Sequence, residues 1–122
     1  MGQRNREILD ALRQSHLFTR LTDVQLERVY RHSQVTELDE GQLLFSQGED
    51  VTSFYLVLSG KIKLFRVSPE GQEKIIEIVP QGGLFAEALM FMDQPNYPVS
   101  STALTRAVVI GIDAKDFKAM LW

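Results

Sequence analysis

Residues 41–60, GQLLFSQGEDVTSFYLVLSG, carry the pattern that decides the fold. Two short runs of strand-forming residues, 43–46 and 54–59, are separated by a stretch of turn-forming residues, and Gly41 and Gly60 close the segment at its ends. Short strands between such turns are typical of antiparallel sheets folded into a sandwich or a closed jelly roll, and not of a parallel α/β sheet.

The next segment of the chain predicts a β-hairpin over residues 61–79. Two strand-like runs, 61–67 and 74–79, flank the turn sequence SPEG, whose residues favour a tight reversal of the chain. The cationic side chains of this hairpin are expected on its solvated face: Lys61, Lys63, Arg66 and Lys74.

The C-terminal third of the chain continues the same pattern after a pair of glycines. Residues 85–90 favour a short helix, and residues 99–104 and 107–112 are predicted to be the closing strands. Asp113 can cap a last helix that begins at Ala114.

Helices are predicted at the N-terminal end. Ile8 and Leu12 lie on one apolar stripe, which Ser15 and His16 interrupt, and Thr22 followed by Gln25 fits a capping box at the start of a second helix. The chain is therefore predicted to be one mainly β domain over residues 1–122, with helices at about 4–33, a β-roll at about 36–112 and a last helix at 114–122.

The composition excludes several classes of function. The chain has no cysteine, which excludes disulfides, thiolate zinc sites and cysteine-ligated iron–sulfur clusters. A net charge of -3 argues against a nucleic-acid surface within these residues. His16 and His32 both precede the predicted strands, so a metal-dependent jelly-roll enzyme is not expected, and no other catalytic motif is visible. The polar N-terminus and the lack of a long apolar run predict a cytoplasmic protein without a membrane segment.

The glycine pattern resembles that of a known family. Residues 41–60, the sequence PEGQ at 69–72 and the sequence GLFAE at 83–87 resemble the cyclic-nucleotide-binding domain of Crp/Fnr-type transcription regulators. The resemblance implies an antiparallel jelly roll with a short helix in its phosphate-binding cassette. It also implies five structural turn glycines: Gly41, Gly48, Gly60, Gly71 and Gly83.

The same resemblance implies a ligand pocket at the cassette, lined by Phe85, Ala86, Glu87, Leu89, Met90 and Tyr97. Glu87 matches the glutamate that holds a ribose hydroxyl in cyclic-nucleotide binders. The arginine that pairs with the cyclic phosphate is missing, since Tyr97 or Pro98 stands at its position, and Ala86 replaces the usual glycine before the glutamate. Cyclic AMP or cyclic GMP is therefore the alternative ligand rather than the favoured one.

A narrower resemblance points to another ligand. The stretch FAEALMFMDQPNYPV at 85–99, with QSHLF at 14–18, is similar to the Dnr-like branch of the family, which comprises denitrification regulators thought to sense nitric oxide through haem. The resemblance implies haem b as a cofactor, with His16 as an iron ligand or gating residue, although His16 is also compatible with a plain hinge position. The apolar residues around the cassette are then either the wall of an apolar pocket or part of the core.

The family also implies a longer regulator that forms a homodimer and binds DNA through a C-terminal domain absent from this chain, in response to a small molecule or a gas. Phe117, Met120 and Leu121 are spaced to form the first turns of a dimer seam, or a stripe lying on the roll.

Overall fold

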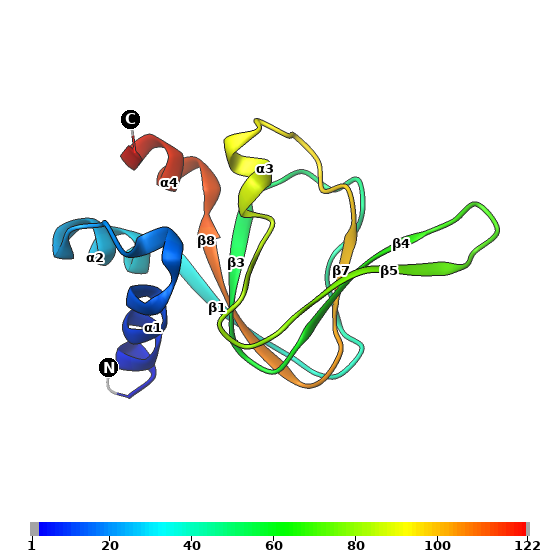
Figure 1. Ribbon diagram of the computed structural model, residues 1–122, viewed down its shortest axis with the longest axis horizontal. Coiled ribbons are helices and arrows are strands. Elements are labelled where there is room, and N and C mark those ends of the chain that lie inside the picture. Colours follow the sequence, from blue (N-terminus) through cyan, green and yellow to red (C-terminus); the bar gives the residue numbers. More distant parts are fainter. Residues whose placement is uncertain (1–2, 122) are drawn as a thin grey trace.

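The computed structural model describes residues 3–121, in which helices pack at one end of a β-roll (Figure 1). The elements in chain order are α1 (Gln3–Gln14), the 3-10 helix η1 (His16–Phe18), α2 (Asp23–Arg31), β1 (Ser33–Leu38), β2 (Leu43–Phe45), β3 (Ser53–Ser59), β4 (Ile62–Val67), β5 (Glu73–Val79), β6 (Leu84–Phe85), α3 (Glu87–Phe91), β7 (Ser100–Ala103), β8 (Ala107–Asp113) and α4 (Ala114–Leu121). The predicted end of the last helix at Trp122 lies outside the described residues.

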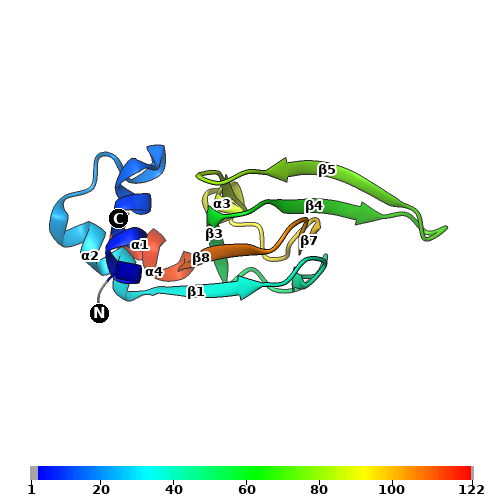
Figure 2. The ribbon, with the colours of Figure 1, turned by 90° about the horizontal axis from the view of Figure 1, so that it is seen from below.

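The strands form two antiparallel four-stranded sheets within residues 3–121, in the orders β1-β8-β3-β6 and β2-β7-β4-β5. This arrangement confirms the predicted mainly β jelly roll. The hairpin β4–β5 projects away from the end of the molecule at which the helices gather, as Figure 1 and Figure 2 both show. β5 is an edge strand, so only β4 pairs with it. No helix within residues 3–121 combines the length and the apolar character needed to cross a bilayer.

The start of α2 follows the predicted capping box. The Thr22 hydroxyl accepts a hydrogen bond from the Gln25 backbone N–H at 3.1 Å, and Gln25 Oε1 accepts one from the Thr22 N–H at 2.9 Å. The end of α2 differs from the prediction, because β1 begins at Ser33 and not near residue 36. The Ser33 hydroxyl donates to the Tyr30 carbonyl at 2.6 Å, which helps to end the helix, and Ser33 already pairs with Ile112 of β8.

The cassette helix also starts later than predicted. Phe85 belongs to β6 and pairs with Tyr55, while Ala86 has a φ of 67°, in the left-handed region. A left-handed residue cannot continue into a right-handed helix, so α3 begins at Glu87.

The turn glycines are used in two ways. Gly41, Gly48, Gly60 and Gly71 have positive φ, whereas in the turn before β6 the left-handed residue is Gly82 rather than Gly83. Gly60 also faces the backbone closely, since a Cβ there would lie 2.2 Å from the Arg106 carbonyl oxygen. At Gly83 the reason for glycine is space, because a Cβ would lie 2.6 Å from a Val79 methyl group.

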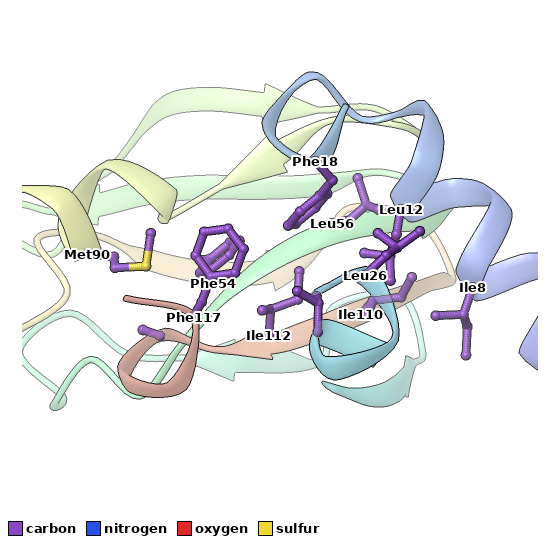
Figure 3. Close-up of a cluster of buried hydrophobic side chains, with 12 residues drawn as sticks. Ile8, Leu12, Phe18, Leu26, Phe54, Leu56, Met90, Ile110, Ile112 and Phe117 are labelled. Atoms are coloured by element: carbon purple, nitrogen blue, oxygen red, sulfur yellow. The ribbon is translucent and has the colours of Figure 1, made fainter. Parts of the chain in front are cut away.

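The buried side chains form two clusters. The helical core joins the helices to one face of β3 and β8 (Figure 3), and its members are Ile8, Leu12, Phe18, Leu26, Val29, Phe54, Leu56, Met90, Ile110, Ile112, Ala114 and Phe117. The roll core lies between the two sheets, and its members are Leu38, Phe45, Tyr55, Val57, Ile62, Leu64, Val79, Phe85, Tyr97, Ala103, Ala107 and Val109. The cassette contributes to both clusters, with Phe85 in the roll core and Met90 in the helical core.

Candidate ligand-binding site

A cavity of about 300 Å³ lies where the cassette meets the roll core. Its volume falls at the lower end of the range for ligand pockets, about 300–1,000 Å³. Most of its lining is apolar, and the lining residues come from four strands, α3 and the loop before β7: Phe45, Leu64, Glu77, Leu84, Phe85, Ala86, Glu87, Ala88, Leu89, Tyr97, Pro98 and Val99. We call this space the cassette cavity.

Stacked aromatic rings support the inner side of the cassette cavity. The rings of Phe45 and Tyr97 stack at 3.8 Å between centroids, and those of Tyr55 and Phe85 stack at 5.1 Å. The Tyr97 hydroxyl donates to the Ser53 carbonyl at 2.8 Å, so its polar end is already engaged with the backbone of β3. Burial, reinforced by the neighbouring Tyr97, raises the pKa of the Tyr55 phenol above its ordinary value. A tyrosine side chain carries no positive charge in either protonation state, so neither Tyr55 nor Tyr97 provides the cation that a phosphate needs.

The start of α3 offers an unpaired carboxylate. Glu87 borders the cassette cavity, and its side chain makes no hydrogen bond or ion pair with any residue in the range 3–121. It follows Ala86, which has a left-handed backbone conformation. Glycine adopts this conformation without steric cost, whereas a residue with a Cβ is strained by roughly 1–2 kcal/mol. The Ala86 methyl group therefore lies at the point where the resemblance places a glycine next to a bound phosphate.

A buried hydroxyl stands behind the cavity wall. Ser101 on β7 is fully buried, and within the described part of the chain its Oγ has no hydrogen-bond partner. Its neighbours across the sheet are Phe45 on β2 and Leu64 on β4, and both of these residues line the cassette cavity. The roll core therefore has a buried hydroxyl without a hydrogen-bond partner close to the unfilled space of the cassette cavity.

The structure brings five of the six predicted pocket residues together: Phe85, Ala86, Glu87, Leu89 and Tyr97. Met90 does not line the cavity, because it points to the other side of α3 and is 5% exposed within the helical core. Phe91 and Met92, in the same apolar run, are exposed.

Sequence reasoning missed four strand residues of the site, Phe45, Leu64, Glu77 and Leu84, and it also missed Val99 in the loop before β7. Alternation along 61–79 was the signal that could have found two of them, since Leu64 and Glu77 face each other across the hairpin.

His16 lies outside the cassette cavity. It is exposed on η1, where its carbonyl accepts a hydrogen bond from the Thr19 hydroxyl at 3.1 Å, while His32 caps the C-terminus of α2. Residues 3–121 contain no group of three or more side chains placed to hold a metal ion. The cavity lining has no histidine, and its tyrosine hydroxyl is engaged with the backbone, so these residues do not fit a histidine-ligated or tyrosine-ligated haem.

The predicted dimer seam divides into buried and exposed residues. Phe117 is 2% exposed and packs edge-on against Phe18 and Phe54, at 5.5 and 5.3 Å between ring centroids. Met120 packs partly buried against the same core, whereas Leu121 is 41% exposed. Phe117 is therefore part of the stripe on the roll and is not available to a partner chain.

A second depression, of about 510 Å³, lies between α1 and the turn before β6. Its polar lining comes mainly from α1, including Arg4, Glu7 and Asp10, and none of the predicted site residues borders it. The cassette cavity is therefore the better candidate site.

The chain belongs to the cyclic nucleotide-binding domain family, whose family model matches residues 35–121. Among solved structures, it is similar to the sensor domain of the transcriptional regulator DNR from Pseudomonas aeruginosa, with a TM-score of 0.91 and 38% identity over 96% of this chain and 78% of that chain. The predicted resemblance to the sensor domains of Crp/Fnr-type regulators is thereby confirmed.

Two curated relatives agree with this assignment. The chain is 28% identical over 107 residues to the cyclic AMP receptor protein of Thermus thermophilus, a match that covers 88% of this chain and 49% of the relative. It is 37% identical over 75 residues to the transcriptional activator protein Anr of Pseudomonas protegens, which covers 62% of this chain and 30% of the relative. The chain thus spans about half the length, or less, of these relatives.

Proposed function

We propose that this chain is the effector-sensing domain of a Crp/Fnr-type transcription regulator, with the cassette cavity as the effector site. The similarity to DNR and Anr, both named as transcriptional regulators, supports this role. In this proposal the intact regulator is a cytoplasmic homodimer that reaches DNA through a domain outside residues 1–122. The sensing domain binds its effector without transforming it.

The observation that carries the proposal is the position of α3 between the cavity and α4. On one side, Leu89 lines the cassette cavity; on the other, Met90 belongs to the same buried cluster as Phe117 of α4 (Figure 3). An ion pair between Asp93, just after α3, and Lys118 of α4 also links the two segments. A ligand that favours one position of α3 therefore favours one position of α4, which is the physical requirement for a sensor.

Exposed apolar side chains on the same two helices support a partner chain in the intact regulator. Phe91 and Met92, at the end of α3, are 50% and 69% exposed, and Leu121 of α4 is exposed as well. Large exposed apolar side chains that lie on adjoining helices are typical of interaction surfaces.

Hydrogen exchange tests the coupling between the cavity and α4. The uncharged fluorophore N-phenyl-1-naphthylamine is an apolar probe for the cassette cavity, and we expect its binding to change amide exchange in α3 and in α4 (Ala114–Leu121) but not in the hairpin tip at 68–72. Leu89→Trp fills the cavity and is expected to abolish both binding and the exchange change. If the probe binds the cavity and exchange in α4 is unaltered, the sensing mechanism is wrong.

Cyclic nucleotide remains the alternative ligand, because Glu87 matches the ribose-binding glutamate and lines the cavity unpaired. We expect no saturable heat when cyclic AMP or cyclic GMP is titrated into the protein, since Tyr97 supplies no charge and a lost charge-assisted hydrogen bond costs about 1.5–3 kcal/mol. Binding that tightens in Ala86→Gly would establish the alternative, because that substitution removes the methyl group beside the expected phosphate position.

Haem and nitric-oxide sensing rests on the resemblance to the Dnr-like branch. A haemin titration followed at the Soret band, with His16→Ala as the comparison, tests the predicted iron ligand. We expect the same spectrum from both proteins, because His16 does not border the cassette cavity. A saturable one-to-one spectrum that is lost in the variant would restore His16 as a ligand and place haem outside this cavity.

A further inference from the structure

Two cations lie on the inner face of the hairpin β4–β5, just beyond the cassette cavity. Leu64 of β4 lines the cavity, and Arg66, two residues further along the strand, is on the same face. The residue directly opposite Arg66 on β5 is Lys74. Because residues directly opposite each other in an antiparallel pair share a face, Lys74 also faces inward.

A bulge in β5 brings Lys74 to this face. Leu64 pairs with Glu77 and Phe65 pairs with Ile75, so Ile76 is left without a partner in the ladder. Strict alternation from the inward-facing Glu77 would have placed Lys74 on the outer face, because a shift of one residue reverses every side chain beyond it. Arg66 and Lys74 are exposed to solvent, as predicted, but they lie on the same face of the hairpin as Leu64, which the sequence did not indicate.

The inner cations lack anionic partners, whereas the outer face has an ion pair. Arg66 Nε donates to the carbonyl of Pro98, a cavity-lining residue, at 3.0 Å. Within residues 3–121, the Lys74 side chain makes no hydrogen bond or ion pair, and like charges directly opposite each other destabilise a sheet. On the outer face, Lys63 Nζ lies 2.8 Å from a Glu73 carboxylate oxygen.

The interior of the cassette cavity is unfavourable for an anion. Glu77 and Glu87 both line it, and Tyr97 occupies the position at which the resemblance places an arginine. An anionic group would therefore be repelled near α3 and attracted near Arg66 and Lys74. The two carboxylates can accept hydrogen bonds from hydroxyl or N–H groups on the body of a ligand.

We infer that the cassette cavity binds an organic anion whose apolar body fills the cavity and whose anionic group is held by Arg66 and Lys74 at its mouth. This inference rests on the proposed function, since it assigns the chemistry of the effector to that same cavity. The hairpin thus supplies, from a different element, the positive charge that the cassette loop lacks.

A matched pair of fluorescent probes tests the inference. 8-Anilinonaphthalene-1-sulfonate is a naphthylamine with a sulfonate, and N-phenyl-1-naphthylamine has the same aromatic body without the charge. In Arg66→Gln/Lys74→Gln we expect the sulfonate to bind at least tenfold more weakly, because charge-assisted hydrogen bonds are lost, while the uncharged probe binds within about twofold of wild type. The control Lys61→Gln/Lys63→Gln removes the same charge from the same hairpin and is expected to leave both affinities unchanged.

The outcomes separate this inference from the proposed function. If the uncharged probe binds the cavity and loss of Arg66 and Lys74 leaves sulfonate binding unchanged, or weakens both probes equally, the anion site is wrong and the effector cavity stands. If neither probe binds the wild-type protein, or if binding survives Leu89→Trp, both proposals are wrong. Melting curves of each variant show whether it is folded.

Discussion

The two buried clusters of this domain differ in the geometry of their aromatic contacts and in the polar groups that they bury. In the helical core, the ring of Phe117 packs edge-to-face against Phe18 and Phe54, with interplanar angles of 90° and 72°, while Phe18 and Phe54 stack on each other. The roll core combines stacked rings with a cavity of about 300 Å³ and the unpartnered Ser101 hydroxyl. Close packing stabilises one arrangement of the side chains, whereas unfilled space and an unsatisfied polar group leave room for a ligand.

This difference indicates a division of tasks within one small domain. The helical core fixes α1, α2 and α4 against β3 and β8, and the roll core holds the candidate ligand site. α3 contacts both, through Met90 and Leu89 respectively. A change in the position of α3 caused by a ligand at the roll core can therefore alter the packing of the helical core.

The largest effect is expected from breaking the helical core. Phe54→Ala removes a fully buried ring from the centre of that cluster and should lower the free energy of unfolding by about 3–5 kcal/mol, measured by urea denaturation. The matched control, Phe91→Ala, truncates a ring that is 50% exposed and should cost no more than about 0.5 kcal/mol. Similar losses for the two variants would contradict the close packing assigned to this cluster.

In the roll core we expect a smaller change, which raises rather than lowers the free energy of unfolding. Ser101→Ala removes a buried hydroxyl that has no partner and should raise the free energy of unfolding by about 1 kcal/mol. Its neighbour Ser100 provides the control, because its Oγ accepts a hydrogen bond from the Gln47 N–H at 2.9 Å, and Ser100→Ala should lower stability by about 0.5–1.5 kcal/mol. If both variants lose stability, Ser101 is satisfied by an ordered water or by a bound molecule.

The strands of the roll and the capping box of α2 were predictable because they depend on local patterns: alternation, turn residues and a cap four residues long. The sequence did not predict which cluster or which face of a sheet each side chain points toward. Leu89 and Met90 are adjacent in sequence but point into different clusters, and a helix as short as α3 shows no periodicity that would separate them. The inward position of Lys74 depends on the bulge at Ile76, for which the alternating sequence gives no signal.

The smallest effect concerns the polar contact that ties α4 to α2 at the edge of the helical core. Arg28 Nη2 donates to Asp116 Oδ1 at 2.8 Å, Arg28 Nε donates to Oδ2 at 3.3 Å, and His32 Nδ1 lies 3.4 Å from Oδ2. The hydrogen bonds from Arg28 hold the pKa of Asp116 below its ordinary value, against the opposing effect of desolvation. Asp116→Asn should therefore lower the melting temperature at neutral pH by no more than a few degrees.

The pH dependence of this difference in melting temperature tests whether the charge of Asp116 causes the stabilisation. A carboxyl group whose pKa is lower in the folded state stabilises the protein above its unfolded pKa, about 3.9, and loses this effect as the pH falls through the folded value. The difference in melting temperature between wild type and Asp116→Asn should thus be full at pH 6–7 and shrink as the pH falls below about 4. Asp10→Asn, at an exposed carboxylate on α1, is the control and should show no such trend. A difference that persists unchanged at pH 3 would mean that shape and hydrogen bonding at Asp116, and not its charge, join α4 to α2.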